Sequence, residues 1–180
     1  MKLLRRSLLA ASLLIGLSAL PGCAGPQVQD YAQAQPRLDL RSYFNGPILA
    51  HGVFTDRQGK VVKRFVVDMQ ATWQGNQGTL DEHFTYSDGT KQRRIWYLTD
   101  HGQGRYSGRA DDVVGEAKGE AAGNALRWQY TLALPVDGRT WHVQFDDWMF
   151  LMDDKVMLNK AVMSKFGFEL GEVTLSFYKR

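Results

Sequence analysis

The sequence has a single cysteine, Cys23, among its 180 residues. An internal disulfide is therefore excluded, and the fold must be stabilised by a packed core. The four histidines do not form His-x-His or His-Glu-x-x-His, so no metal site is predicted. The chain also lacks the Gly-x-Ser-x-Gly elbow of serine hydrolases, and Gly102-x-Gly104 does not extend to a dinucleotide fingerprint. The sequence thus predicts no cofactor and no catalytic triad.

The chain also has little excess charge. It carries 22 basic and 19 acidic residues, a formal net charge of +3. The whole excess comes from Lys2, Arg5 and Arg6, which are followed by an apolar stretch. The remainder is balanced in charge and lacks the basic surface typical of nucleic-acid binding, so no nucleic-acid partner is predicted.

Residues 1–22 are predicted to be a lipoprotein signal peptide. The apolar stretch Ser7–Leu20 has the length of a signal sequence and is too short to span a membrane comfortably. Leu20-Pro21-Gly22-Cys23 follows it and resembles a bacterial lipobox, in which Cys23 carries the lipid after cleavage. A plain secretory signal is the alternative. By resemblance to Gram-negative lipoproteins, Ala24 implies an outer-membrane lipoprotein facing the periplasm, with Cys23 as its membrane anchor.

Beyond the leader, the composition divides the chain into a tether and one domain. Residues 23–37 are polar, contain two prolines and show little periodicity, which predicts a flexible lipidated tether. Residues 38–180 are rich in aromatic and apolar residues and are long enough for a single β-barrel domain with its own core.

Helical periodicity is nearly absent from this domain, and alternation of apolar and polar residues replaces it. The clearest case is the pair 125–134 and 139–150, joined by Pro135-Val136-Asp137-Gly138, a strong hairpin signal. Similar patterns predict about ten strands, over 48–55, 61–73, 79–86, 92–99, 104–109, 115–121, 125–134, 139–150, 156–163 and 168–178. Tight turns between them predict an all-β, antiparallel up-and-down meander, closed into a barrel that removes its edges.

The segment 102–123 is unusually rich in glycine. Gly115, Gly119 and Gly123 recur among alanines and charged residues. This pattern predicts a thin, bent strand, where glycine allows either coiling of the sheet or close approach of a ligand to the backbone.

Alternation also places two acids inside the barrel. Glu82 shares a face with Leu80 and Phe84, and Asp147 shares one with Trp141 and Phe145. A buried carboxylate must be paired, hydrogen-bonded or protonated. The nearest predicted partner is Arg94, and the other candidates are Arg109, Arg127 and Asn159. A structural polar network, a polar floor for a ligand and acid–base catalysis remain open interpretations.

The many aromatic residues are a core in the simplest interpretation, yet small barrels also enclose single ligands. An apolar interior with a few polar groups would suit a fatty or polyisoprenoid molecule. The predicted ligand-binding residues are Glu82, Arg94, Trp96, Trp128, Tyr130, Asp147, Trp148 and Asn159.

Several short motifs follow the lipobox in order along the chain. They are Phe44-Asn45-Gly46, Asp56-Arg57-Gln58-Gly59-Lys60, Trp73-Gln74-Gly75, Leu80-Asp81-Glu82, Arg94-x-Trp96, Asp112-Val113-Val114-Gly115, Gly123-Asn124-Ala125-Leu126 and Asp146-Asp147-Trp148-Met149. In these motifs the chain resembles the bacterial lipoproteins grouped as domain-of-unknown-function family 3833. The resemblance implies an envelope lipoprotein with a calycin-like (lipocalin-like) barrel and no established activity. It also favours a link to lipids.

Three functions follow from this reading. The first is a module that binds a lipid-like or other apolar small molecule. The second is an envelope interaction or structural protein with a filled barrel and a protein partner. The third is a lipid-directed isomerase or hydratase that uses Asp147 or Glu82 as its acid–base group.

Overall fold

The computed structural model describes residues 25–136 and 138–180. The predicted signal peptide 1–22 and the predicted lipidation site Cys23 lie outside the described residues.

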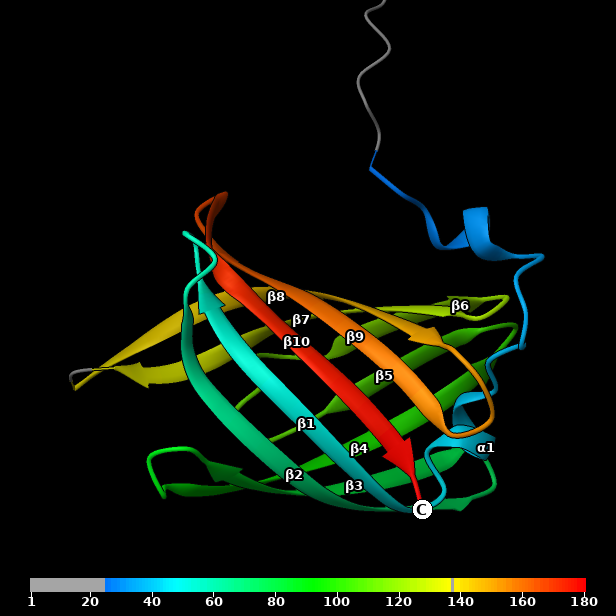
Figure 1. Cartoon of the computed structure of the whole chain (residues 1–180). Helices are drawn as coiled ribbons and strands as arrows, with labels where there is room; N and C mark the ends of the chain where they lie inside the picture. The colour runs from blue at the N-terminus through cyan, green and yellow to red at the C-terminus, as the bar shows by residue number, and fades with distance from the viewer. Residues whose placement is uncertain (1–24, 137) are drawn as a thin grey trace, which may run out of the picture.

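Ten antiparallel strands of the described chain form a closed barrel (Figure 1). Each strand pairs with the next in sequence, and β10 pairs with β1 to close the sheet. The strands are β1 (Gly46–Asp56), β2 (Val61–Gln74), β3 (Gln77–Tyr86), β4 (Lys91–Gly102), β5 (Arg105–Arg109), β6 (Ala117–Ala122), β7 (Ala125–Val136), β8 (Arg139–Leu151), β9 (Val156–Lys165) and β10 (Phe168–Lys179). This confirms the predicted all-β, antiparallel up-and-down meander closed into a barrel, and closure leaves no long open edge.

The barrel forms because alternate residues on each strand are apolar and point inward. On β2, Phe65, Val67, Met69 and Ala71 are all buried, whereas the residues between them are more exposed. β8 shows where the pattern ends: Trp141, expected in the interior, is 42% exposed. The β7–β8 hairpin extends beyond the barrel wall (Figure 1), so the alternation there no longer corresponds to burial.

A short helix, α1 (Leu40–Tyr43), closes one end of the barrel. Its backbone is capped by the Asp39 carboxylate, which accepts a hydrogen bond from the Ser42 amide at 2.9 Å. Phe44 follows the helix, and its carbonyl accepts a hydrogen bond from the Trp73 indole at 2.7 Å. Sequence periodicity did not reveal this helix, because it is a single turn. Within the described parts of the chain, no helix is both long and apolar enough to cross a membrane.

The segment before α1 lies against the outside of the barrel. Its 3-10 helix η1 (Val28–Tyr31) packs on β6 and β7, and Val28 is buried. The Tyr31 ring meets Trp148 and Phe150 edge-on, with ring centroids 5.8 and 5.1 Å apart. From Val28 onward, therefore, the predicted tether lies against the barrel wall, where Val28 and Tyr31 pack.

One part of the wall is closed by a loop rather than by a full strand. β5 and β6 are short, and residues 110–116 connect them across the second half of β7. Val114 donates to the Thr131 carbonyl, and Ala133 donates to the Asp112 carbonyl, each at 2.8 Å. This loop brings Asp112 to the edge of the interior, next to the first half of β4.

Candidate functional site

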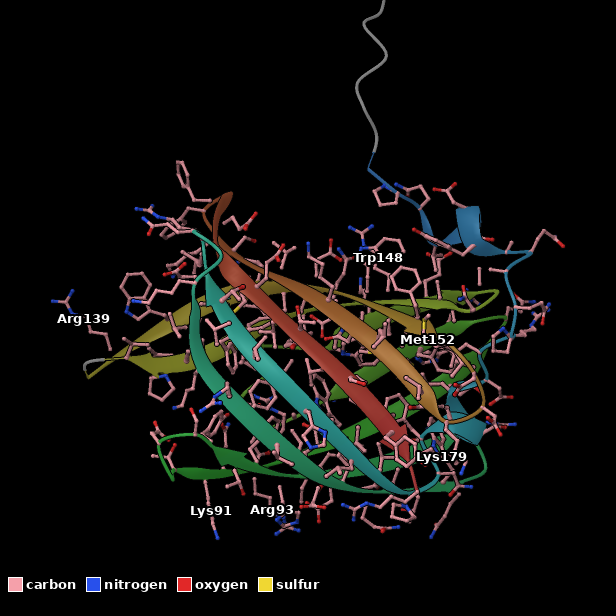
Figure 2. All side chains as sticks on the ribbon, in the orientation of Figure 1. Lys91, Arg93, Arg139, Trp148, Met152 and Lys179 are labelled. Carbon is pink, nitrogen blue, oxygen red and sulfur yellow. The ribbon has the colours of Figure 1, made fainter. Side chains whose placement is uncertain are left out.

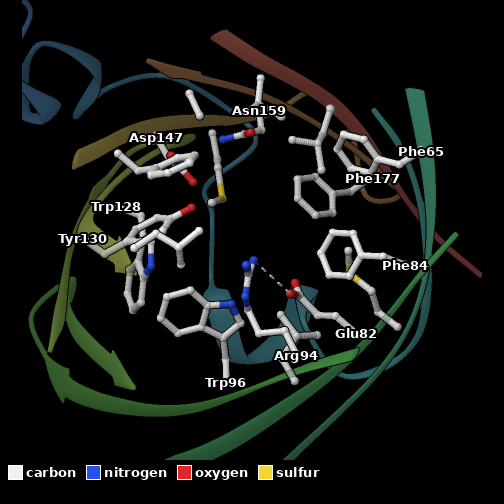
Figure 3. Close-up of a pocket in the computed structure, with 18 of the residues that line it drawn as sticks. Phe65, Glu82, Phe84, Arg94, Trp96, Trp128, Tyr130, Asp147, Asn159 and Phe177 are labelled. Carbon is white, nitrogen blue, oxygen red and sulfur yellow. Dashed lines mark ion pairs between the residues drawn. The ribbon is translucent and has the colours of Figure 1, made fainter. Parts of the chain in front are cut away.

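A cavity of about 200 Å³ occupies the barrel interior. Its walls are mostly aromatic and aliphatic side chains from nearly all strands, and Leu40 and Phe44 lie at its closed end. Figure 3 shows polar groups on two sides of it: Glu82 and Arg94 on one, Asp147 and Asn159 on the other. The cavity is therefore apolar with a few separate polar positions, as in many small-molecule sites.

Glu82 and Arg94 are directly opposite each other on β3 and β4. The Arg94 Nη1 lies 4.0 Å from Glu82 Oε2, a loose ion pair (Figure 3). Arg94 bonds more closely to Asp112, with Nη2 2.7 Å from Oδ2 and Nε 3.0 Å from Oδ1. Burial raises the pKa of Glu82 to about 7, although the Arg94 charge opposes this effect. Glu82 is therefore partly protonated near neutral pH.

Asp147 lies on β8, between Trp128 of β7 and Ala161 of β9. It is 7% exposed, and its Oδ1 accepts no hydrogen bond from any described residue. Burial and the neighbouring Asp146 charge raise the pKa of Asp147 well above its usual value. Burial therefore favours the neutral form of Asp147, and its unpartnered Oδ1 keeps hydrogen-bonding capacity in the cavity wall.

Asn159 also points into the cavity, from β9 (Figure 3). It is 3% exposed, and its Nδ2 donates to the Trp148 carbonyl at 3.4 Å. Its side chain adds an amide to the side of the cavity that carries Asp147.

The three predicted interior aromatics form one cluster. The Trp96 ring meets Trp128 and Tyr130 edge-on, with centroids 5.7 and 5.4 Å away. Trp128 lies against two glycines, since a β-carbon on Gly108 or Gly119 would be 2.7 or 2.4 Å from its ring. The glycine-rich segment therefore makes room for a side chain of the protein itself.

Trp148 does not belong to the site, contrary to the prediction. It follows the inward-facing Asp147, so its side chain points outward, where Figure 2 shows it near the N-terminal segment. There it packs on Tyr31 and Phe150, and the Arg127 guanidinium lies 5.3 Å from its ring. Because neighbouring residues on a strand point to opposite faces of the sheet, Asp147 and Trp148 cannot both line the cavity.

The two arginines named as alternative partners for the interior acids are engaged elsewhere, whereas Asn159 lines the cavity with Asp147. Arg127 pairs with Asp146 at 2.7 Å, and Arg109 pairs with Glu116 at 3.3 Å. Sequence reasoning missed Asp112, the closest partner of Arg94. Asp112 lies in a loop, where alternation gives no orientation, although its neighbour Val113 is an apolar residue that signals burial of that loop.

The arrangement is suited to binding the polar end of an apolar molecule. Across residues 25–136 and 138–180, no group of three His, Cys, Asp or Glu side chains is placed to hold a metal ion. The polar groups can accept or donate hydrogen bonds to one end of an apolar molecule.

A family model matches the sequence, and solved structures are similar to the barrel. A model of the family described as "Protein of unknown function (DUF3833)" matches residues 17–179. The structure is similar to an S-type phycobiliprotein lyase, CPES, from Guillardia theta, with a TM-score of 0.59, 6% identity, and 86% of this chain and 98% of that chain covered. It is also similar to EF1p2_mFAP2b bound to DFHBI, with a TM-score of 0.43, 11% identity, and coverage of 86% and 100%. No curated protein matches the sequence.

Proposed function

Since the chain belongs to the family DUF3833, whose description states no activity, we propose its function from the barrel: it binds a small, largely apolar molecule in its interior. The observation that carries this proposal is an apolar cavity into which buried carboxyl groups project with an unused hydrogen-bonding atom each, Oε2 of Glu82 and Oδ1 of Asp147. A buried polar atom without a partner is costly unless something compensates it. A ligand with a polar end would do so.

The cavity limits the chemistry of this ligand. About 200 Å³ is less than the roughly 300–1,000 Å³ of drug-sized sites, so the ligand is slender, like an acyl or isoprenoid chain. Because Asp147 and Glu82 have raised pKa values, they would meet a neutral hydroxyl or amide better than an anion. We therefore favour a lipid-like alcohol, amide or protonated acid.

The test uses the chain that begins at Cys23, delipidated, and a fluorescent long-chain fatty alcohol as the probe, because the proposed ligand is neutral. Binding is measured as excitation transfer from Trp96 and Trp128 to the bound probe. The signal should saturate as the probe concentration rises. Ala161→Leu narrows the cavity beside Asp147. It should raise the dissociation constant about tenfold, the equivalent of roughly 1.4 kcal/mol of binding free energy.

The matched control is Lys160→Leu, which adds an apolar side chain on the outer face of the same strand. It should leave binding unchanged. Thermal unfolding of both variants shows that each is folded. Absence of saturable binding to the wild-type chain, or equal loss in both variants, would contradict the proposal.

We also propose that the protein is a lipoprotein of the outer membrane, anchored at Cys23 and facing the periplasm. The leader, the lipobox and Ala24 support this proposal. Expression of the full chain in a Gram-negative host, followed by mass spectrometry of its N-terminal peptide, should reveal a diacylglycerol-modified cysteine in the outer-membrane fraction. The Cys23→Ser variant should lack the modification and leave that fraction.

The two other functions receive less support. An interaction protein with a filled barrel does not match the observed cavity. A lipid isomerase or hydratase would use Glu82 or Asp147, but the burial of both acids and the ion pair of Glu82 are explained equally well by ligand binding.

A further inference from the structure

The end of the barrel opposite α1 carries exposed aromatic side chains. Phe166 and Phe168, at the β9–β10 turn, are 84% and 75% exposed, the highest values among the large apolar residues that the structure describes. Trp141, on the neighbouring β7–β8 hairpin, is 42% exposed. Isolated surface apolar residues are ordinary, but protruding aromatics gathered on adjacent hairpins indicate an interaction surface.

The backbone of the turn makes Phe166 still less expected. Lys165 pairs with Phe168, and the two residues between them, Phe166 and Gly167, have φ of 53° and 80°. Two-residue hairpin turns with both φ positive favour Asn, Asp or Gly at the first position. Phe166 is thus favoured neither by the turn nor by packing, and a functional contact outside the chain would explain it.

Cations accompany these rings. The Lys165 Nζ lies 4.7 Å from the Phe166 ring centroid and 4.8 Å from that of Trp141. Arg139 lies at the end of the β7–β8 hairpin (Figure 2). The adjacent β1–β2 turn contributes Arg57 and Lys60, with Asp56 and Glu169 as the nearby acids of the described turns.

We propose that this aromatic rim, consisting of Trp141, Lys165, Phe166 and Phe168, binds the surface of an anionic phospholipid bilayer. Aromatic rings prefer the headgroup region, and flanking Lys and Arg bind anionic headgroups. A bilayer fits this small group of protruding rings and cations better than a protein partner, whose interface would require a larger, well-packed patch.

The position of the rim agrees with this occupant. In Figure 1 the β9–β10 turn and the first described residues both lie toward the upper side of the view, so a membrane on that side would meet the turn close to the start of the described chain. The end of the barrel opposite α1 would then lie near the lipid. The rim proposal does not require that the cavity binds a ligand, because it depends only on surface residues.

The test uses the chain from residue 23 to 180 with Cys23→Ser, so that no lipid anchor contributes. Its sedimentation is measured with vesicles of phosphatidylethanolamine containing one quarter phosphatidylglycerol. Phe166→Asn should weaken binding about tenfold, the expected loss from one buried phenyl ring. Since Asn suits the turn, the melting temperature should be unchanged or higher.

Two further variants sharpen the result. Lys165→Glu should weaken binding to these vesicles and have a smaller effect on vesicles of phosphatidylcholine alone. Tyr97→Asn removes a ring that is 58% exposed on the outer wall of β4, away from the rim, and should bind as the wild type does. The proposal is overturned if the wild-type chain does not sediment, if folded Phe166→Asn binds normally, or if Tyr97→Asn loses as much binding.

Discussion

Glu82 and Asp147 reach the interior by the same rule that buries their apolar neighbours. Each alternates with outward-facing residues on its strand, and each is 7% exposed. Their surroundings differ, because Glu82 faces the Arg94 guanidinium whereas Asp147 lies among Trp128, Ala161 and Tyr130. Burial and the Asp146 charge thus raise the pKa of Asp147, whereas the nearby Arg94 charge opposes the rise in the pKa of Glu82.

At the scale of single residues, Gly119 sets the position of Trp128 in the cavity wall. We expect Gly119→Ala to destabilise the protein by about 1–3 kcal/mol, because a β-carbon 2.4 Å from the Trp128 ring forces the ring to move. Urea unfolding measures the loss, and near-ultraviolet circular dichroism should report the displaced indole. Gly25→Ala, where the new methyl group meets no atom within 4 Å, is the neutral control. Equal stability of Gly119→Ala and wild type would show that the ring is not confined.

At the scale of elements, alternation was sufficient to predict all ten strands and the inward direction of Glu82 and Asp147. It could not predict features set by contacts between distant segments. The one-turn helix α1, the packing of η1 on the wall and the Arg94–Asp112 pair each depend on residues far apart in sequence. Trp148 was misassigned because it was chosen for its aromatic ring, although its place after Asp147 already implied the outer face.

The N-terminal segment is fixed to the wall at Gly123. The Leu38 amide donates to the Gly123 carbonyl at 2.8 Å, and a β-carbon on Gly123 would overlap the Tyr31 carbonyl oxygen. Gly123→Asn introduces a residue that tolerates the positive φ of 53°, but its β-carbon would overlap the Tyr31 carbonyl oxygen. We expect residues 25–37 to detach, with faster hydrogen exchange there and an unchanged barrel.

Gly115→Asn is the matched control for this variant. Gly115 also has a positive φ, of 73°, but a β-carbon there meets no atom within 4 Å. Its exchange pattern should match the wild type. Protection of residues 25–37 that survives in Gly123→Asn would mean that the segment is not held at this point.

The loop 110–116 is tied to β4 by Arg94 and Asp112. Asp112→Asn removes a charge-assisted, bidentate contact, and we expect a loss of about 1–3 kcal/mol in the free energy of unfolding. Hydrogen exchange should increase in residues 110–116 before it increases in β7. Asp111→Asn, at the exposed neighbouring position, should change neither quantity. A double-mutant cycle with Arg94→Met isolates the pair, and a coupling energy near zero would contradict its role.

At the scale of the whole molecule, the acids buried inside the barrel lower its stability. Closure pairs every strand on both sides, and the core surrounds acids that an optimally stable protein would replace with hydrocarbon. Retention of these acids is expected when a site needs them, since function commonly reduces stability. As a consequence, the free energy of global unfolding should depend on pH.

We expect the free energy of unfolding to fall as the pH rises from about 4.5 to 7. The pKa of Glu82 rises from 4.5 in the unfolded chain to about 7 in the folded one, so the folded state holds the proton more tightly in this window. Its contribution is complete below 4.5 and is lost by about pH 7, a change of roughly 3 kcal/mol. Asp147 acts in the same direction. Asp81, whose pKa is lowered by its hydrogen bond to Arg93, acts only at lower pH, where its contribution disappears as it protonates.

Urea unfolding at pH 5 and pH 8 measures this dependence. Glu82→Gln cannot ionise, so its stability should differ less between the two pH values, with Asp147 accounting for the remaining slope. Glu116→Gln, which removes an exposed carboxylate paired with Arg109, should keep the full wild-type slope. A wild-type stability that rises over this range, or a slope that Glu82→Gln leaves intact, would show that Glu82 is ionised inside the folded barrel. The interior would then hold a fixed anion opposite Arg94, and a cationic ligand would replace the neutral one favoured above.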